Sequence, residues 1–134
     1  NLEDYEKAVE LRKKVYEARK QILGENHPDT LDSLDSLAIS YRCLGDDEKS
    51  VELMEKVYEA RKRIQGENHP DTLDSLDSLA ISYGCLGDDE KLEELMKKIY
   101  EARKRILGEN HPDTLESWNR LSRIYDIVGK IRLD

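Results

Sequence analysis

The sequence lacks phenylalanine and holds only three prolines, two cysteines and one tryptophan among 134 residues. Its longest apolar runs are a few residues, too short for a membrane-spanning helix of about 20 apolar residues or for a secretory signal. Two cysteines cannot build a disulfide framework, so we expect a reducing, cytoplasmic location. A net charge of −8 makes duplex DNA and anionic membranes poor partners, so we expect neither.

Charged residues make up 39% of the chain, a content at which disorder is a real alternative. An internal repeat argues against it. The segment GENHPDTL occurs at 24–31, 66–73 and 108–115, always 42 residues apart. Alignment of 2–43 with 44–85 gives 34 identical residues of 42, and the next alignment, with 86–127, gives 28 of 42. Three copies in register predict a repeat protein.

Glycine and proline mark the limits of the repeating elements. Every proline falls at one phase of the repeat and six of seven glycines, Gly129 included, fall at two phases. Glycine ends helices and proline suits the first helical position, so each unit is predicted to hold two helices and two turns. The predicted helices are 3–23, 28–44, 46–65, 70–86, 88–107 and 112–128.

Apolar residues recur at helical spacing within each predicted helix. The shorter helices show this spacing at Leu34, Leu37, Ala38, Tyr41 and Leu44, and in the second copy at Leu76, Leu79, Ala80, Tyr83 and Leu86. The longer helices show it at Val51, Met54, Val57, Tyr58 and Ile64, and in the third copy at Leu95, Met96, Ile99, Tyr100 and Ile106. One pair of such helices cannot bury its own apolar stripe, whereas stacked pairs can. The pattern therefore predicts an all-α solenoid with one continuous core.

These residues resemble the tetratricopeptide repeat. Leu34, Leu37, Ala38, Tyr41 and Gly45, followed by Met54 and Val57, match its spacing, and the 42-residue length with LGENHPDTL resembles kinesin light chain repeats. The resemblance implies a right-handed superhelical solenoid of about six helices. We expect a single array over 1–134, as a fragment of a longer array or one that stops there: a long helix 3–23, pairs 28–65 and 70–107, and a final short helix 112–128.

One departure from the family concerns the packing of the helices. The family favours a small residue where this chain has Ser50 and Leu92. The bulk of Leu92 is expected to widen a close helix contact, so that the second and third units pack less tightly than the first two.

No residue pattern predicts catalysis, a cofactor or a metal site, and the chain is not expected to be an enzyme. His27, His69 and His111 are repeat equivalents, so one repeat separates them and a shared ion is excluded; each is expected to be a turn residue or a helix cap. Cys43 and Cys85 are also repeat equivalents, too far apart for a disulfide, whose Cα atoms lie within about 7 Å. Both are expected to be small hydrophobic residues, buried or half-buried.

The resemblance implies that the shorter helices line a concave groove that holds an extended peptide. Carried over by position, the groove residues are Asp32, Asp35, Ile39, Arg42, Asp74, Asp77, Ile81, Glu116, Asn119 and Arg123, with Cys43, Gly84, Cys85 and Asp126 beside them. The acidic residues predict a groove floor that prefers a basic or neutral segment. The alternative is that these carboxylates only keep the helices soluble.

Two functions follow from this pattern. The first is a non-enzymatic scaffold that binds a partner peptide or protein in the groove. The second is a self-associating module that stacks end to end through its unpaired terminal helices, as a homo-oligomer. Contacts of the second kind are heterologous and need not close into a ring.

Overall fold

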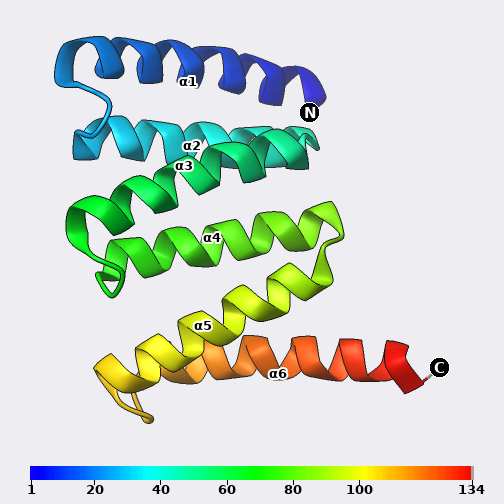
Figure 1. Cartoon of the computed structure of the whole chain (residues 1–134). Coiled ribbons are helices and arrows are strands. Elements are labelled where there is room, and N and C mark those ends of the chain that lie inside the picture. The colour runs from blue at the N-terminus through cyan, green and yellow to red at the C-terminus, as the bar shows by residue number, and fades with distance from the viewer. Residues whose placement is uncertain (134) are drawn as a thin grey trace.

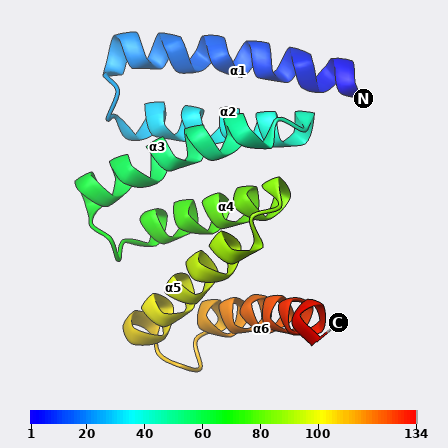
Figure 2. The same ribbon diagram turned by 45° about the vertical axis from the view of Figure 1, so that its right-hand side comes forward.

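The computed structural model describes the backbone of residues 1–133 and the side chains of residues 1–127. Its six helices are α1 (Leu2–Leu23), α2 (Pro28–Leu44), α3 (Asp47–Gln65), α4 (Pro70–Leu86), α5 (Asp89–Leu107) and α6 (Pro112–Leu133). Successive helices run antiparallel and stack from α1 to α6 (Figures 1 and 2). The described residues contain no strand, so the predicted all-α solenoid is confirmed.

The turn before each even-numbered helix is closed by a histidine. The Nδ1 atom of His27 accepts a hydrogen bond from the backbone N–H of Asp29 at 3.1 Å. His69 and His111 make the same bond, at the same length, to the second residue that follows each of them. An N-cap acceptor satisfies an N–H group that the helix leaves without a partner. The histidines are therefore helix caps, as predicted.

The turn before α3 and α5 is a left-handed glycine followed by an aspartate cap. Gly45 and Gly87 have φ angles of 92° and 93°, a conformation that glycine adopts without strain. The side chains of Asp46 and Asp88 then accept from backbone N–H groups three residues on, at 3.1 Å. Both aspartates lie just outside their helix, which explains why α3 and α5 begin one residue later than the sequence predicted.

The sixth helix does not end where the sequence predicted. It continues past 128, through Gly129, to Leu133. Lys130 stands where the two earlier turns have a capping aspartate, so no side-chain acceptor starts a new helix there. A glycine inside a helix costs only about 1 kcal/mol relative to alanine, so the helix can pass through Gly129.

The core is one continuous cluster that runs through the stack from α2 to α6. Its most buried members include Ala38, Met54, Val57, Leu76, Ala80, Ile99 and Leu121, each 2% exposed or less. Some predicted core positions are wrong: Ile64, Leu86 and Ile106 are at least 42% exposed, and Cys43 and Cys85 are exposed as well. All five lie in the last turn of a helix, next to a connecting turn, where no neighbouring helix covers them.

The first half of α5 is less covered than the first half of α3. Helix α3 buries seven residues and α5 buries four. Leu92 is only partly buried where Ser50 is fully buried, and Glu93 replaces the buried Val51. This difference agrees with the looser packing predicted around Leu92.

Candidate functional site: the face of the even-numbered helices

Helices α2, α4 and α6 are linked in turn by arginine side chains, and the side of the molecule that they share is called here the even face. Arg42 of α2 donates to Ser78 O and Ser82 Oγ of α4, at 3.5 and 3.3 Å. Arg120 of α6 donates to Asp77 Oδ2 of α4 at 2.6 Å. The predicted groove residues all belong to these three helices.

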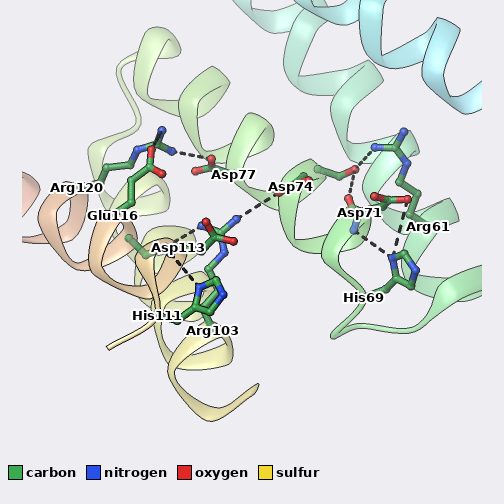
Figure 3. Close-up of polar contacts among 12 residues, drawn as sticks. Arg61, His69, Asp71, Asp74, Asp77, Arg103, His111, Asp113, Glu116 and Arg120 are labelled. Atoms are coloured by element: carbon green, nitrogen blue, oxygen red, sulfur yellow. Dashed lines mark hydrogen bonds and ion pairs between the residues drawn. The ribbon is translucent and has the colours of Figure 1, made fainter. Parts of the chain in front are cut away.

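Two acidic residues of this face are paired with arginines from the odd-numbered helices. Arg61 of α3 contacts Asp32 at 2.7 Å. Arg103 of α5 contacts Asp74 at 3.3 Å (Figure 3). Both arginine side chains are only 12% exposed, whereas the carboxylates are largely exposed. Desolvation by burial raises the pKa of Asp74, and the charge of Arg103 opposes that rise. These carboxylates tie neighbouring helices together, so the expected acidic floor is partly neutralised.

Two further acidic residues share one arginine within the even face itself. Arg120 reaches Asp77 at 2.6 Å and Glu116 at 2.8 Å, so one guanidinium joins two carboxylates on adjacent even-numbered helices (Figure 3). The sequence placed Asp77 and Glu116 in the groove, and the structure brings them together around Arg120. Arg120 itself was not among the predicted groove residues.

Asp35 is the repeat equivalent of Asp77, but its surroundings differ. Ser78 stands where Arg120 stands in the next unit, so no arginine reaches Asp35 in the same way. Its Oδ1 atom is buried and has no hydrogen-bond partner in the described part of the chain. Desolvation by burial raises the pKa of Asp35, although the charges of Arg61 and Arg42 act against the rise. Asp35 therefore differs from Asp32, Asp74 and Asp77, each of which is paired with an arginine.

The junction of α2, α3 and α4 is polar. Ser50 of α3 is fully buried, and its hydroxyl lies 3.0 Å from the hydroxyl of Ser82. Arg42 contacts the same Ser82 hydroxyl, so its side chain lies across the surface at this point. Ile39, a predicted groove residue, packs against the core nearby and is only partly exposed.

The junction of α4, α5 and α6 is apolar, because other residues stand there at the repeat positions of Arg42, Ser50 and Ser82. Gly84, Leu92 and Ile124 stand 42 residues after Arg42, Ser50 and Ser82. A Cβ atom on Gly84 would lie 3.0 Å from a methyl carbon of Leu92, closer than most real contacts, so the missing side chain gives Leu92 its room.

An open apolar groove of about 390 Å³ results at this junction. Its lining is Ile81, Gly84, Cys85, Leu92, Met96, Arg120, Arg123 and Ile124. Two predicted residues, Ile81 and Arg123, thus meet in one groove, and Ile81 is 37% exposed there. Asn119 is exposed and lies outside this lining.

The repeat pattern contains two signals, one for the paired arginines Arg61 and Arg103 and one for the apolar groove. Arg61 and Arg103 recur at one phase of the repeat, each 29 residues after its aspartate partner. The groove was signalled by the joint replacement of Arg42, Ser50 and Ser82 in the following unit.

Other kinds of site find little support. Within the described residues, no three His, Cys, Asp or Glu side chains gather as a metal site would require. None of the helices there combines the length and apolar character needed to cross a membrane.

Comparison with known proteins identifies the fold family. Sequence profiles of the tetratricopeptide repeat match residues 1–63, 37–91 and 72–113. No curated protein matches the sequence.

Solved structures agree with these profiles. A crystal structure of kinesin light chain-like, nearly identical TPR-like repeats from Podospora anserina is 30% identical, with a TM-score of 0.83 over 96% of this chain. A variant of the same Podospora protein gives a TM-score of 0.82. BtubC from P. vanneervenii, 24% identical over 91% of this chain, shares the fold with a TM-score of 0.75. The chain spans 61% of the Podospora structure and 48% of BtubC.

With three profile matches over most of its length and the six-helix stack above, the chain belongs to the tetratricopeptide repeat family, and its repeats are of the kinesin light chain kind.

Proposed function

We propose that this chain is a non-enzymatic interaction scaffold that binds an extended segment of a partner protein along the even face. The observation that carries the proposal is the open apolar groove at Gly84, where α4, α5 and α6 meet. A shallow apolar site with a few polar groups at its edge suits a side chain of a protein ligand. The fold family supports a protein partner in general.

The chemistry of the even face narrows the partner. An aliphatic side chain fits the groove, because its walls are Ile81, Leu92, Met96 and Ile124. A basic side chain fits beside Asp35, whose half-buried carboxylate is not paired with an arginine as Asp32, Asp74 and Asp77 are. The ligand is therefore a segment with one aliphatic and one basic residue that spans α2 to α6. This narrows the expectation of an acidic floor that prefers a basic or neutral segment.

The test uses peptides selected from a random displayed library and then labelled for fluorescence anisotropy. Selected peptides should share an aliphatic and a basic residue at fixed spacing, and replacing the aliphatic residue by serine should weaken binding about tenfold. Gly84→Arg should also weaken binding about tenfold, because the new side chain would cover the groove. Arg42, the repeat equivalent of Gly84, lies across the surface in this way in the preceding unit. Since a side chain on Gly84 would crowd Leu92, Ile81→Lys serves as a second variant at a partly exposed position.

Glu59→Gln is the matched control, because this exposed residue of α3 lies outside the even face. It should bind like the unmodified chain. Selected peptides that bind all four proteins equally, or that shift the NMR signals of α1 and α3 only, would overturn the proposal.

A further inference from the structure

A second pocket lies where α3, α4 and α5 meet, at the opposite end of α4 from the Gly84 groove, and has a volume of about 250 Å³. It shares no lining residue with that groove. Leu73, Leu76 and Ala102 form the apolar part of its wall. Helix α3 also packs against α2, and α5 against α6, so the pocket lies among inner helices of the stack (Figure 1). A further repeat stacked at either end would not cover it.

The phenol of Tyr58 is a buried donor in this pocket. Tyr58 is 7% exposed, and its buried hydroxyl has no hydrogen-bond partner among the described residues. Burial acts to lower the pKa of Lys98, but Tyr58 and Glu67 outweigh it and raise that pKa, so the ammonium group lies close to both. A lysine ammonium group has only donors, so it cannot accept the proton of the phenol. The pocket therefore lacks a hydrogen-bond acceptor at this point.

The charges around the phenol match one negative charge. The charged residues that line the pocket are Glu67, Lys98, Glu101 and Arg105. In addition, the Nζ atom of Lys62 lies over the Tyr58 ring, 5.9 Å from its centre. Three cations against two carboxylates leave one positive charge uncompensated among these groups, on a chain whose net charge is −8. A carboxylate carries one negative charge, whereas a phosphate group carries up to about two. The missing acceptor is therefore best supplied by a carboxylate.

The ion pair that now occupies this place is exchangeable. Lys98 contacts Glu67 at 3.3 Å, and both side chains are about half exposed. An exposed pair of this kind contributes little to stability. One repeat earlier, Lys56 and Glu25 line the equivalent pocket, of about 440 Å³. There the lysine contacts Glu52 instead, at 4.0 Å. The same residue types thus adopt a second arrangement, in which the lysine has left the glutamate of the turn.

We propose that the pocket at Tyr58 binds the carboxylate of an acidic side chain on a partner protein. The incoming carboxylate takes the place of Glu67 beside Lys98 and accepts the hydrogen bond that the Tyr58 hydroxyl offers. Leu76 and Ala102 contact the methylene groups of the same side chain. This site lies apart from the Gly84 groove, and the inference does not depend on the peptide binding proposed there.

Peptides selected from a random displayed library on the unmodified chain test the inference. Clones that also bind the Lys98→Glu variant are removed, so that only ligands of this pocket remain. The remaining peptides should share an acidic residue, and replacing it by the corresponding amide should weaken binding about tenfold in fluorescence anisotropy. A selection that leaves no clone, or only clones without an acidic residue, would overturn the inference.

Two variants distinguish binding at this pocket from a purely structural role. Tyr58→Phe removes only the hydroxyl and should weaken binding about tenfold, because the carboxylate loses a charge-assisted hydrogen bond. Glu67→Gln removes the competing carboxylate and should strengthen binding about threefold. Tyr100→Phe is the matched control, because Tyr100 is the repeat equivalent of Tyr58 and lies outside the lining of the pocket. It should bind like the unmodified chain.

Circular dichroism confirms that each variant is folded. Peptides that bind the Tyr58→Phe variant as tightly as the unmodified chain, or that bind the Glu67→Gln variant more weakly, would contradict the proposed contacts. Gly84→Arg should leave the binding of these peptides unchanged, so that a failure here is separate from a failure of the groove proposal.

Discussion

Two junctions of this solenoid occupy the same place in successive repeats and are built from opposite chemistry. The α2–α3–α4 junction joins Arg42, Ser50 and Ser82 by hydrogen bonds, and the α4–α5–α6 junction packs Leu92 and Ile124 over Gly84. The three positions change together, because a buried serine needs a polar partner and a leucine at this site needs space. The comparison shows how an array of near-identical repeats acquires one distinctive surface.

The largest expected effect is the loss of stability when the methionine near each junction is replaced by alanine. Met54→Ala should lower the free energy of unfolding by about 3 kcal/mol, because Met54 is fully buried and the cavity cannot collapse fully. Met96→Ala should cost about 2 kcal/mol, since Met96 lines the open groove and solvent already reaches that side. Urea denaturation measures both values, and an equal loss would show that the two junctions are packed alike.

Exchanging one junction for the other should reveal strong coupling among its three positions. Ser50→Leu alone should cost about 2 kcal/mol, because it overfills a buried site and leaves Ser82 with fewer partners. Adding Arg42→Gly and Ser82→Ile recreates the apolar junction of the next unit. The triple variant should be more stable than the sum of the single changes by about 1 kcal/mol or more. Additive losses would mean that the three positions do not act together.

Asp77 and Asp35 are repeat equivalents, but removing the charge of each should change the free energy of unfolding in opposite directions. Asp77→Asn removes the ion pair with Arg120 and should lower stability at pH 7 by about 0.5 kcal/mol, as for a partly exposed pair. The loss should shrink in high salt, where screening weakens the pair. Thermal denaturation at two salt concentrations measures the effect, and a loss independent of salt would contradict an electrostatic origin.

Asp35→Asn should raise stability at pH 7, by about 0.5 kcal/mol. Burial raises the pKa of Asp35 in the folded chain above the ordinary value of 3.8. The folded carboxyl thus holds its proton to higher pH than the unfolded one, so stability falls as pH rises through that window. The advantage of asparagine should vanish below pH 3.8. A destabilising effect at pH 7 would show that Asp35 has a favourable partner in solution.

The smallest effect concerns Tyr83 of α4. Burial and the hydrogen bond that its hydroxyl donates to Glu55 raise its pKa to about 12. Glu55→Gln should move the ionisation of one tyrosine back toward the ordinary value of 10 without altering the fold. Ultraviolet titration of the phenolate detects this change, and identical titration curves for the two proteins would show that Glu55 does not contact the phenol.

Much of the fold could be predicted because its signals are local. The caps at His27 and Asp46 and the glycine at Gly45 act within a few residues, so the limits of α2 and α4 agree with the sequence prediction. The prediction failed at Gly129 because a glycine alone does not end a helix, and the two earlier turns also needed their aspartate. The predicted extension of this array into a longer one stays a prediction.

The candidate site could be predicted only as a set of positions. The resemblance to the tetratricopeptide repeat assigned Asp77, Glu116, Ile81 and Arg123 to the groove, and these residues belong to the even-numbered helices. Their roles did not follow, because the arginines that pair with the aspartates lie 29 residues away or on a different helix. The residue types alone therefore overestimated the free negative charge of these positions, because three of the predicted aspartates are paired with arginines.

By itself the sequence determined the period of the repeat, the limits of α2 and α4 and the solenoid, because turn residues and apolar spacing act over one or two helical turns. Only the tertiary structure decided which carboxylates are paired, which cysteines are exposed, and where an apolar groove opens. These depend on side chains from three helices at one point in space. A change from Arg42 to Gly84 has little local effect, and its meaning appears only when Leu92 and Ile124 pack beside it.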